Sequence, residues 1–393
     1  MDAQGFSNVC KKILQKRIHK YKAYVRYLVQ NGIIQESTYY IPGKKSRGIR
    51  FCRRYQSDLK PIIITKCTLI KSIIGYHAKI NVQKTQEIHF LKKWFNPKIQ
   101  VDLEGAQTFL QTLKTNEELN GNLHAQQAYN SRLLPLLELA HGEYSFGVDS
   151  TGFRLHTNLT RTMKELRKFI TYDGETLHSV DIVNSQPFLA RPLFDENYFT
   201  KNDIAGKIIN TNLTDQQSFP IMIVKMIREI KTQPDVKTYL KLVTEGTFYE
   251  SFGRLLISNG LYEGEVVNTS VRTIVKKITM SALFNANTAI GWNPHIRVFA
   301  HIFPAVYGMI KLIKKGNGKH PAYSIMLQRL EAELILDKVC VRINKAYPHI
   351  PIFTIHDSIV TTEKYLTVVQ NFVKKIMRQN VGASPQLKVE TWE

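Results

Sequence analysis

Two apolar runs that each contain one aspartate constrain this chain more than any other feature of its sequence. Residues 352–360 contain the triplet His356-Asp357-Ser358, and residues 177–183 contain Asp181. Both runs are β-prone and lead into turn-forming residues. An ionised carboxylate among apolar residues is costly unless it binds a positive partner. The runs therefore predict two strands that present Asp181 and Asp357 to a metal ion.

A second signal lies between the two aspartates, in residues 271–284. Four side chains recur there at intervals of four residues: Arg272, Lys276, Met280 and Phe284. On a helix this spacing makes one slowly spiralling stripe, with the cations first and the apolar groups after them. A triphosphate needs fixed positive charge, and a base needs a flat apolar surface. Together with the two carboxylates, the stripe predicts two-metal nucleotidyl transfer.

In this order the motifs resemble those of the A-family DNA polymerases and the phage-type single-subunit RNA polymerases. The family has an aspartate that closes a palm strand, a fingers helix of the form Arg-x3-Lys-x3-(Phe/Met)-x3-(Tyr/Phe), and a His-Asp pair in a palm hairpin. Asp181, residues 271–284 and His356-Asp357 are similar to these three motifs. Residues 152–158 are similar to the family's duplex-contacting strand, and residues 385–392 to its closing strand. The resemblance covers residues 150–393.

The resemblance implies an α+β right-hand polymerase, with a palm at 149–200 and 320–393, fingers at 201–319 and a short helical thumb at 101–148. It implies catalytic roles for Asp181, Asp357 and Lys276. It places two Mg²⁺ ions, or Mn²⁺ in their stead, on Asp181, Ile182 and Asp357. Nucleotide contacts would come from Arg272, Met280, Phe284 and Gln186, and duplex contacts from Arg154 and Gln328.

The residues alone leave blander interpretations open. Either aspartate could cap a turn, and Gln328 and Glu331 could equally face solvent or pair with a neighbouring helix. Residues 103–140 predict two helices broken at Asn120-Gly121, which fit a thumb and a plain packing pair of helices equally.

Three positions leave the choice of sugar open. Gln186 stands five residues after Asp181, where DNA-making relatives carry a Glu that blocks a ribose 2′-hydroxyl and RNA-making relatives carry a small residue. Phe284 lacks the hydroxyl of the usual Tyr, which helps RNA-making relatives to recognise ribose. Both favour deoxynucleotides, whereas Ser358 matches the RNA-making group.

The leading function is therefore a DNA polymerase that extends a primer 3′-hydroxyl with dNTPs. It would work without proofreading, because no upstream segment offers the carboxylates of an exonuclease. The first alternative is an RNA polymerase or primase-like enzyme. The second is a DNA-binding initiator or regulator with an inactive polymerase fold.

The first hundred residues carry most of the positive charge. They contain 21 Lys and Arg against 4 Asp and Glu, which gives +17 of the chain's formal +22. So uneven a charge favours a nucleic-acid partner, a DNA template-primer or RNA, over a merely solvated basic face. An apolar helical stripe from Tyr21 to Val29, with Ser7 as a possible cap upstream, precedes a hairpin expected at 38–41 and 49–51. This pattern predicts a winged-helix-like region at 1–100, whose loop contacts phosphates through Lys44, Lys45 and Arg47.

The remaining composition bounds the class of protein. With 43% hydrophobic residues among 393, the chain can bury a sizeable core. Its four cysteines show no Cys-x-x-Cys spacing and are expected to be reduced thiols. No apolar run approaches the roughly 20 residues of a membrane span, and Met1 begins no signal peptide. We expect an intracellular monomer, in the cytoplasm or nucleoid, with no membrane partner.

Overall fold

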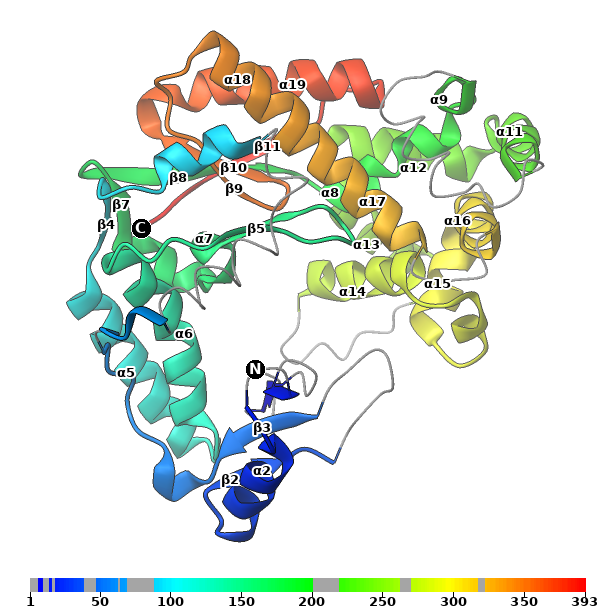
Figure 1. Cartoon of the computed structure of the whole chain (residues 1–393). Helices are drawn as coiled ribbons and strands as arrows, with labels where there is room; N and C mark the ends of the chain where they lie inside the picture. Colours follow the sequence, from blue (N-terminus) through cyan, green and yellow to red (C-terminus); the bar gives the residue numbers. More distant parts are fainter. Residues whose placement is uncertain are drawn as a thin grey trace. The chain divides into compact units, whose positions relative to one another are not determined.

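The computed structural model describes residues 6–9, 14–15, 18–38, 47–62, 64–68, 88–200, 219–261, 270–316 and 322–393. The chain divides into two compact units, and each combines helices with strands. Unit 1 contains residues 1–74, 99–144 and 161–171, and unit 2 contains residues 75–98, 145–160 and 172–393. Figure 1 follows the elements of both units along the chain.

A small antiparallel sheet forms the described N-terminal part of unit 1. β3 (Gly48–Phe51) pairs with β2 (Ile34–Glu36) on one side and with β1 (Ser7–Asn8) on the other. α2 (Tyr21–Gln30) contacts β2 and ends just before Gly32, whose φ of 63° breaks the helix.

The structure corrects parts of the predicted N-terminal helix and hairpin, and other parts fall on residues that it does not describe. Ser7 pairs with Ile49 and is therefore a strand residue, not a residue at the predicted cap position. β2 ends at Glu36, earlier than the predicted strand at 38–41, of which residues 39–41 lie outside the described residues. Lys44 and Lys45 also lie outside them, whereas Arg47 is described and exposed.

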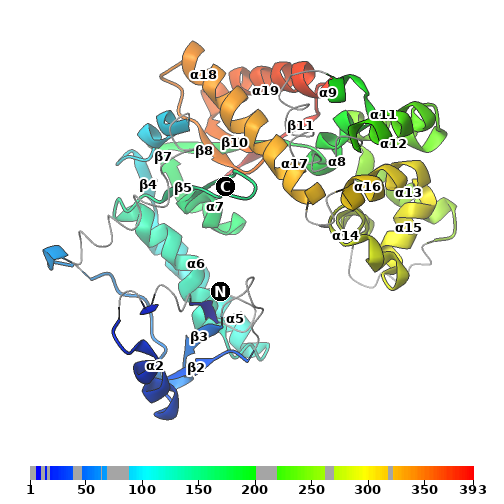
Figure 2. The ribbon, with the colours of Figure 1, turned by 45° about the vertical axis from the view of Figure 1, so that its right-hand side comes forward.

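Two long helices form the other part of unit 1. α5 (Leu103–Leu119) and α6 (Ala125–Ala140) pack side by side, as both Figure 1 and Figure 2 show. Asp102 caps α5 by accepting a hydrogen bond from the Gly105 amide at 2.9 Å. The predicted pair of helices and its break at Asn120-Gly121 are confirmed. Strands β4 (Ile99–Val101) and β7 (Ile170–Tyr172) are neighbours in a sheet.

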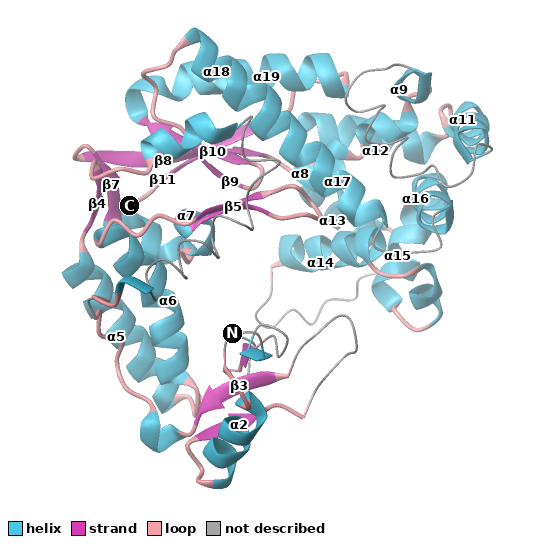
Figure 3. Ribbon diagram, viewed as in Figure 1, coloured by secondary structure: helices cyan, strands magenta, loops and turns pink. Residues whose placement is uncertain are grey.

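An antiparallel sheet lies at the centre of unit 2 (Figure 3). β8 (Glu175–Ile182) pairs with β10 (Ser358–Thr362) and with β11 (Leu387–Thr391), and β10 also pairs with β9 (Phe353–Ile355). α19 (Leu366–Val381) packs on β8 and β10. Its buried side chains recur at helical spacing: Val369, Val373, Ile376 and Met377.

The other elements of unit 2 are mostly helical. A short hairpin, β5 (Phe146–Val148) with β6 (Leu155–Thr157), precedes the central sheet in sequence. The main helices are α8 (Ser185–Leu189), α9 (Asn197–Thr200), α11 (Phe219–Ile230), α12 (Pro234–Glu245), α13 (Phe248–Ser258), α14 (Val271–Phe284), α15 (Pro294–Ile302), α16 (Pro304–Gly316), α17 (Ala322–Ala332), the π-helix η6 (Glu333–Cys340) and α18 (Val341–Ala346). The shorter turns of unit 2 are η2 (His89–Trp94), η4 (Arg191–Phe194), η5 (Asn287–Gly291) and η7 (Glu363–Tyr365). The turns η1 (Arg53–Tyr55) and η3 (Lys164–Phe169) belong to unit 1, and α7 (Asn158–Arg161) runs along the chain from unit 2 into unit 1.

Aromatic side chains fill the core between these helices. Neighbouring ring centroids lie 5.1 to 5.9 Å apart in a fully buried cluster of Tyr239, Phe248, Phe252, Phe299 and Phe303. Each buried aromatic ring contributes about 1.5 to 3 kcal/mol to the free energy of unfolding. The cluster holds α12, α13 and α15 together, and α14 packs directly against α13 and α15.

Both ends of α14 are fixed by side chains. Ser270 accepts a hydrogen bond from the Thr273 amide at the first turn. At the last turn, Lys314 of α16 donates to the carbonyls of Ala282 at 2.6 Å and Asn285 at 2.8 Å. Burial lowers the pKa of Lys314 to about 8. The helix that carries the cationic stripe is therefore held in a defined rotation.

The described cysteines Cys52, Cys67 and Cys340 are free thiols. Of the helices in the described ranges, none has both the length and the apolar character needed to cross a membrane.

Candidate active site

The register of the central sheet brings the two predicted aspartates together at one end of it. β8 and β10 run antiparallel, with Val180 opposite Ile359. Continued by one residue, this register places Ser358 opposite Asp181, and Asp357 directly precedes Ser358. Directly opposed residues have Cβ atoms about 5 Å apart. Asp181 and Asp357 therefore lie at the same end of the sheet, and both are partly exposed.

The turn that carries Asp357 is tight. Ser358 pairs with Ile355, so the β9–β10 loop contains only His356 and Asp357. His356 has a φ of 56°, a left-handed conformation that non-glycine residues rarely adopt and that two-residue hairpin loops require. Its ring lies 6.2 Å from the ring of His156 on β6. The turn therefore holds Asp357 in a defined direction.

Polar atoms without partners surround the same end of the sheet. Among the described residues, no hydrogen bond reaches the buried side-chain amide atoms of Asn184, the Oε1 atom of Gln186 or the hydroxyl of Ser358. Buried polar groups are normally satisfied, so each of these atoms needs a partner that the described residues do not supply. All three residues lie within five positions of Asp181 or Asp357 in sequence.

The donor set fits a hard divalent cation. Within the described ranges, no three His, Cys, Asp or Glu side chains converge into a metal-binding group. The carboxylates of Asp181 and Asp357 are nevertheless oxygen donors of the kind that Mg²⁺ prefers, and Ile182, whose main-chain oxygen is the other predicted donor, follows Asp181 in the chain. Mg²⁺ usually takes one or two carboxylates from a protein and completes its octahedron with water and substrate phosphates. The site therefore suits an ion that arrives together with a phosphorylated substrate.

The stripe predicted on α14 is the less buried side of that helix. Arg272 and Lys276 are exposed, and Met280 and Phe284 are partly buried against the core. Arg272 forms an ion pair with Glu250 and lies 5.3 Å from the ring centre of Tyr249. Among the described residues, Lys276 makes no hydrogen bond or ion pair.

Lys277 has different surroundings from Lys276. The pKa of His295 on α15 is lowered by burial and, in addition, by the positive charge of Lys277. Lys277 therefore lies on the α15 side of α14, away from the stripe. This arrangement leaves Lys276 as the lysine of the pair that belongs to the stripe.

The electrostatics of Tyr249 connect the stripe to the aspartates. Burial raises the pKa of the Tyr249 hydroxyl, Arg272 opposes this effect and the charge of Asp357 adds to it. The charges of Arg272 and Asp357 thus both act on the Tyr249 hydroxyl. Arg272 in the first turn of α14 contacts the Tyr249 ring, and the charge of Asp357 in the β9–β10 turn acts on the hydroxyl of the same residue.

Arg154 and Gln186 both bind the carboxylate of Glu331 on α17. Arg154 donates through Nε at 2.8 Å and through Nη2 at 2.9 Å, and Gln186 donates through Nε2 at 2.5 Å. The side chain of Glu331 is 1% exposed, so the solvent-facing interpretation of this residue is wrong. Its burial follows from its spacing, because Leu327 and Ile335, four residues to either side, are also buried.

Gln328 packs against the loop between β5 and β6. A Cβ atom added at Gly152 would stand 2.7 Å from the Gln328 side-chain oxygen, so glycine is the residue that permits this approach. Arg329 donates to the Thr151 carbonyl at 2.8 Å in the same loop. The structure therefore brings Gln328 and Arg154 to the same contact between α17 and the β5–β6 hairpin.

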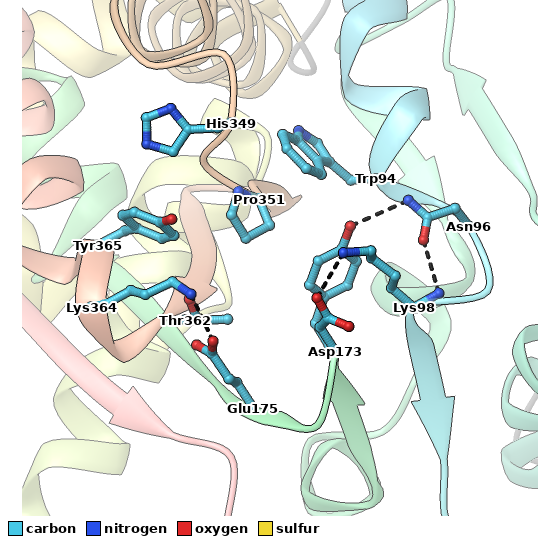
Figure 4. A pocket seen from close by; sticks show the side chains of 11 residues that line it. Trp94, Asn96, Lys98, Asp173, Glu175, His349, Pro351, Thr362, Lys364 and Tyr365 are labelled. Carbon is cyan, nitrogen blue, oxygen red and sulfur yellow. Dashed lines mark hydrogen bonds and ion pairs between the residues drawn. The ribbon is translucent and has the colours of Figure 1, made fainter.

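A separate pocket lies at the other end of β8 and β10 (Figure 4). Glu175 and Asp181 are six positions apart on β8, which corresponds to about 20 Å. In the pocket Lys98 pairs with Asp173, and Lys364 pairs with Glu175, each at 2.7 Å. Since carboxylates already neutralise both lysines, this pocket offers a phosphate little net attraction. Its rings come from Trp94, Tyr172, His349 and Tyr365.

Comparison with known proteins does not define a family for this chain. No protein-family model matches it, and no curated protein matches it. One solved structure that it resembles is the POL domain of Pol1 from M. smegmatis, in complex with DNA primer-template and dNTP. The TM-score is 0.33 at 12% sequence identity, over 83% of this chain and 66% of that one. The chain thus spans slightly less than two thirds of that structure's length.

Proposed function

We propose that this chain is a template-directed nucleotidyltransferase, with primer extension by dNTPs as the leading activity. The observation that carries the proposal is the β8–β10 register, which sets Asp181 beside the turn that bears Asp357. The stripe of α14 supports it, because Arg272 contacts Tyr249, and the charge of Asp357 also acts on the Tyr249 hydroxyl. In this proposal the central sheet is the palm, the helices around α14 are the fingers, and α5 and α6 are a short thumb.

The residues of the chain would act mainly by positioning. Asp181, Asp357 and the main-chain oxygen of Ile182 would hold two Mg²⁺ ions, or Mn²⁺ in their stead. Such ions, when bound, favour ionisation of the primer 3′-hydroxyl and neutralise charge on the leaving pyrophosphate. Lys276 and Arg272 would bind the triphosphate oxygens, and Lys276 would donate a proton to pyrophosphate. Arg272 would exchange Glu250 for phosphate, and Met280 and Phe284 would contact the nascent base pair.

Extension of a labelled primer tests the proposal directly. DNA and RNA templates are each offered with dNTPs or with rNTPs, in Mg²⁺ and in Mn²⁺. Extension with dNTPs supports the leading function. A preference for rNTPs would favour an RNA polymerase or primase, the alternative supported by Ser358. Tight duplex binding without any extension would favour an initiator or regulator.

Gln186 is the proposed sugar gate of this enzyme. Its side chain is held by Glu331, and the hydroxyl of Tyr239 holds the adjoining Pro187 carbonyl at 2.9 Å. Gln186→Ala removes the bulk that would exclude a 2′-hydroxyl, so we expect the ratio of rNTP to dNTP kcat/KM to rise by about 10- to 100-fold. Single-nucleotide incorporation kinetics measure this ratio. Gln107→Ala, at an exposed position of α5, is the matched control and should leave it unchanged.

The basic N-terminal region is proposed to bind template. Replacing Lys44, Lys45 and Arg47 together by Gln removes up to three phosphate contacts. The slope of log affinity for DNA against log salt should then flatten by up to about 3 units. A salt titration of DNA binding measures the slope.

Turnover at saturating template should stay near normal in the same variant. A matched control neutralises three exposed cations on α19, Lys374, Lys375 and Arg378, and should leave the slope unchanged. An equal change in both variants would show that the slope reports net charge and not a contact by this loop.

A further inference from the structure

The carboxylate of Glu331 is the most deeply buried acidic group beside the candidate active site. It lies on α17 and binds side chains from two other elements, Arg154 of the β5–β6 hairpin and Gln186 of α8. Removing an ionisable group from water costs free energy that a hydrophobic residue of similar size would not cost. Burial and, to a smaller extent, the negative charge of Asp357 raise the pKa of Glu331 to about 7, while the charge of Arg154 and the hydrogen bonds from Arg154 and Gln186 oppose this rise. Packing alone therefore does not explain why this position carries an acid.

The hydrogen bonds at Glu331 require a group that only accepts. Arg154 contributes two donors and Gln186 contributes one, and they meet the two oxygens of one side chain. An ionised carboxylate accepts all three, whereas an amide of the same shape would turn an N–H group towards one of them. The charge of Arg154 also compensates that of the carboxylate, in a two-pronged geometry that fixes both groups.

This arrangement determines which atom of Gln186 can meet a ligand. Its Nε2 atom is committed to Glu331, and its Oε1 atom is buried without a partner among the described residues. The backbone of α8 is held separately, by the buried hydrogen bond from Tyr239 to the Pro187 carbonyl. The orientation of the Gln186 amide therefore depends on Glu331, while the position of its backbone does not.

We infer that Glu331 is a positioning residue for sugar selection, which orients Gln186 and at the same time holds Arg154 through the same carboxylate. The inference rests on the proposed function, because it assigns the control of that site's substrate preference. It also links two contacts that are otherwise separate. A change at Glu331 would alter both the choice of nucleotide through Gln186 and the grip on the duplex through Arg154.

A reciprocal exchange tests the contact. Glu331→Gln places an amide N–H against a donor, so we expect discrimination between dNTP and rNTP to fall about tenfold or more. Gln186→Glu alone sets two carboxylates side by side and should also impair discrimination. In the double variant, Gln186→Glu with Glu331→Gln, the amide nitrogen of residue 331 donates to the new carboxylate, and its oxygen still accepts from Arg154 Nε. Arg154 Nη2 loses the oxygen that it shared with Gln186, so discrimination should recover in part and exceed that of either single variant.

The readouts separate positioning from a merely structural role. Primer extension gives kcat/KM for each nucleotide, filter binding gives duplex affinity, and thermal unfolding reports stability. Glu333→Gln, two positions further along the same helical segment and partly exposed, is the matched control and should behave as wild type. Rescue of discrimination in the double variant, beyond any recovery of thermal stability, supports the inference.

Two results would overturn it. One is unchanged discrimination in folded Glu331→Gln, and the other is a double variant no better than its worse single variant. If Glu331→Gln fails to fold, the comparison of Gln186→Glu with the double variant still decides. Absence of any extension by the wild-type chain would overturn the proposed function together with the inference, whereas an active wild type with no rescue would overturn the inference alone.

Discussion

Asp181→Asn and Asp357→Asn are each expected to lower nucleotide addition by about 10³-fold or more while leaving the fold intact. An amide keeps the size of the carboxylate but supplies no negative charge to a cation. Stability should change by no more than about 0.5 kcal/mol, because both side chains are partly exposed and neutralising either one relieves repulsion between neighbouring carboxylates. Single-turnover extension at saturating Mg²⁺ measures nucleotide addition, and thermal unfolding measures stability. Duplex binding shows whether the variant still holds its substrate.

Asp173→Asn is the matched control for both variants. Asp173 lies near the other end of β8, where it pairs with Lys98 in an exposed ion pair. Such pairs contribute little to stability, so this variant should keep nearly full activity. Substantial extension by Asp181→Asn or Asp357→Asn would contradict the assignment of the site, and loss of folding would show that the carboxylates serve the sheet instead.

The local parts of this fold could be predicted from the sequence. The strands around Asp181 and Asp357, the stripe on α14 and the pair of helices α5 and α6 all follow from periodicity and turn residues within one segment. The structure contains these strands and helices at the predicted places, because the apolar pattern of each segment is enough to determine its secondary structure. The resemblance to a polymerase family rests on the same local motifs.

The parts that depend on distant partners could not be predicted. Ser7 reads as a helix cap in its own segment, yet it pairs with Ile49 across a sheet. Glu331 reads as a possible surface residue, yet Arg154 and Gln186 reach it from elements far away in sequence. Arg272 reads as a free cation for phosphate, yet Glu250 of α13 holds it here. In each case the partner depends on how separate elements pack together, and the apolar pattern of one segment does not predict that packing.

Lys276→Ala is expected to lower kcat/KM for the incoming nucleotide by about 10²-fold, whereas Lys277→Ala should change it by less than about threefold. Neighbouring residues on a helix point about 100° apart, so the two lysines cannot share one ligand surface. Lys276 belongs to the stripe with Arg272, while the charge of Lys277 acts on His295 of α15. Lys277→Ala is therefore the matched control for Lys276→Ala, because the two lysines are adjacent and both are exposed.

The pattern of the loss identifies what Lys276 does. Triphosphate binding alone would raise KM with kcat unchanged, whereas proton donation to pyrophosphate would lower kcat as well. Lys276→Arg separates the two roles, because arginine keeps the positive charge but is a much weaker acid than lysine. Steady-state kinetics of this variant over a range of pH give kcat and KM separately. Restored KM with low kcat in Lys276→Arg would assign both roles to this lysine. Equal losses in Lys276→Ala and Lys277→Ala would mean that the nucleotide does not meet α14 along the stripe, and the proposed placement of the triphosphate would have to be abandoned.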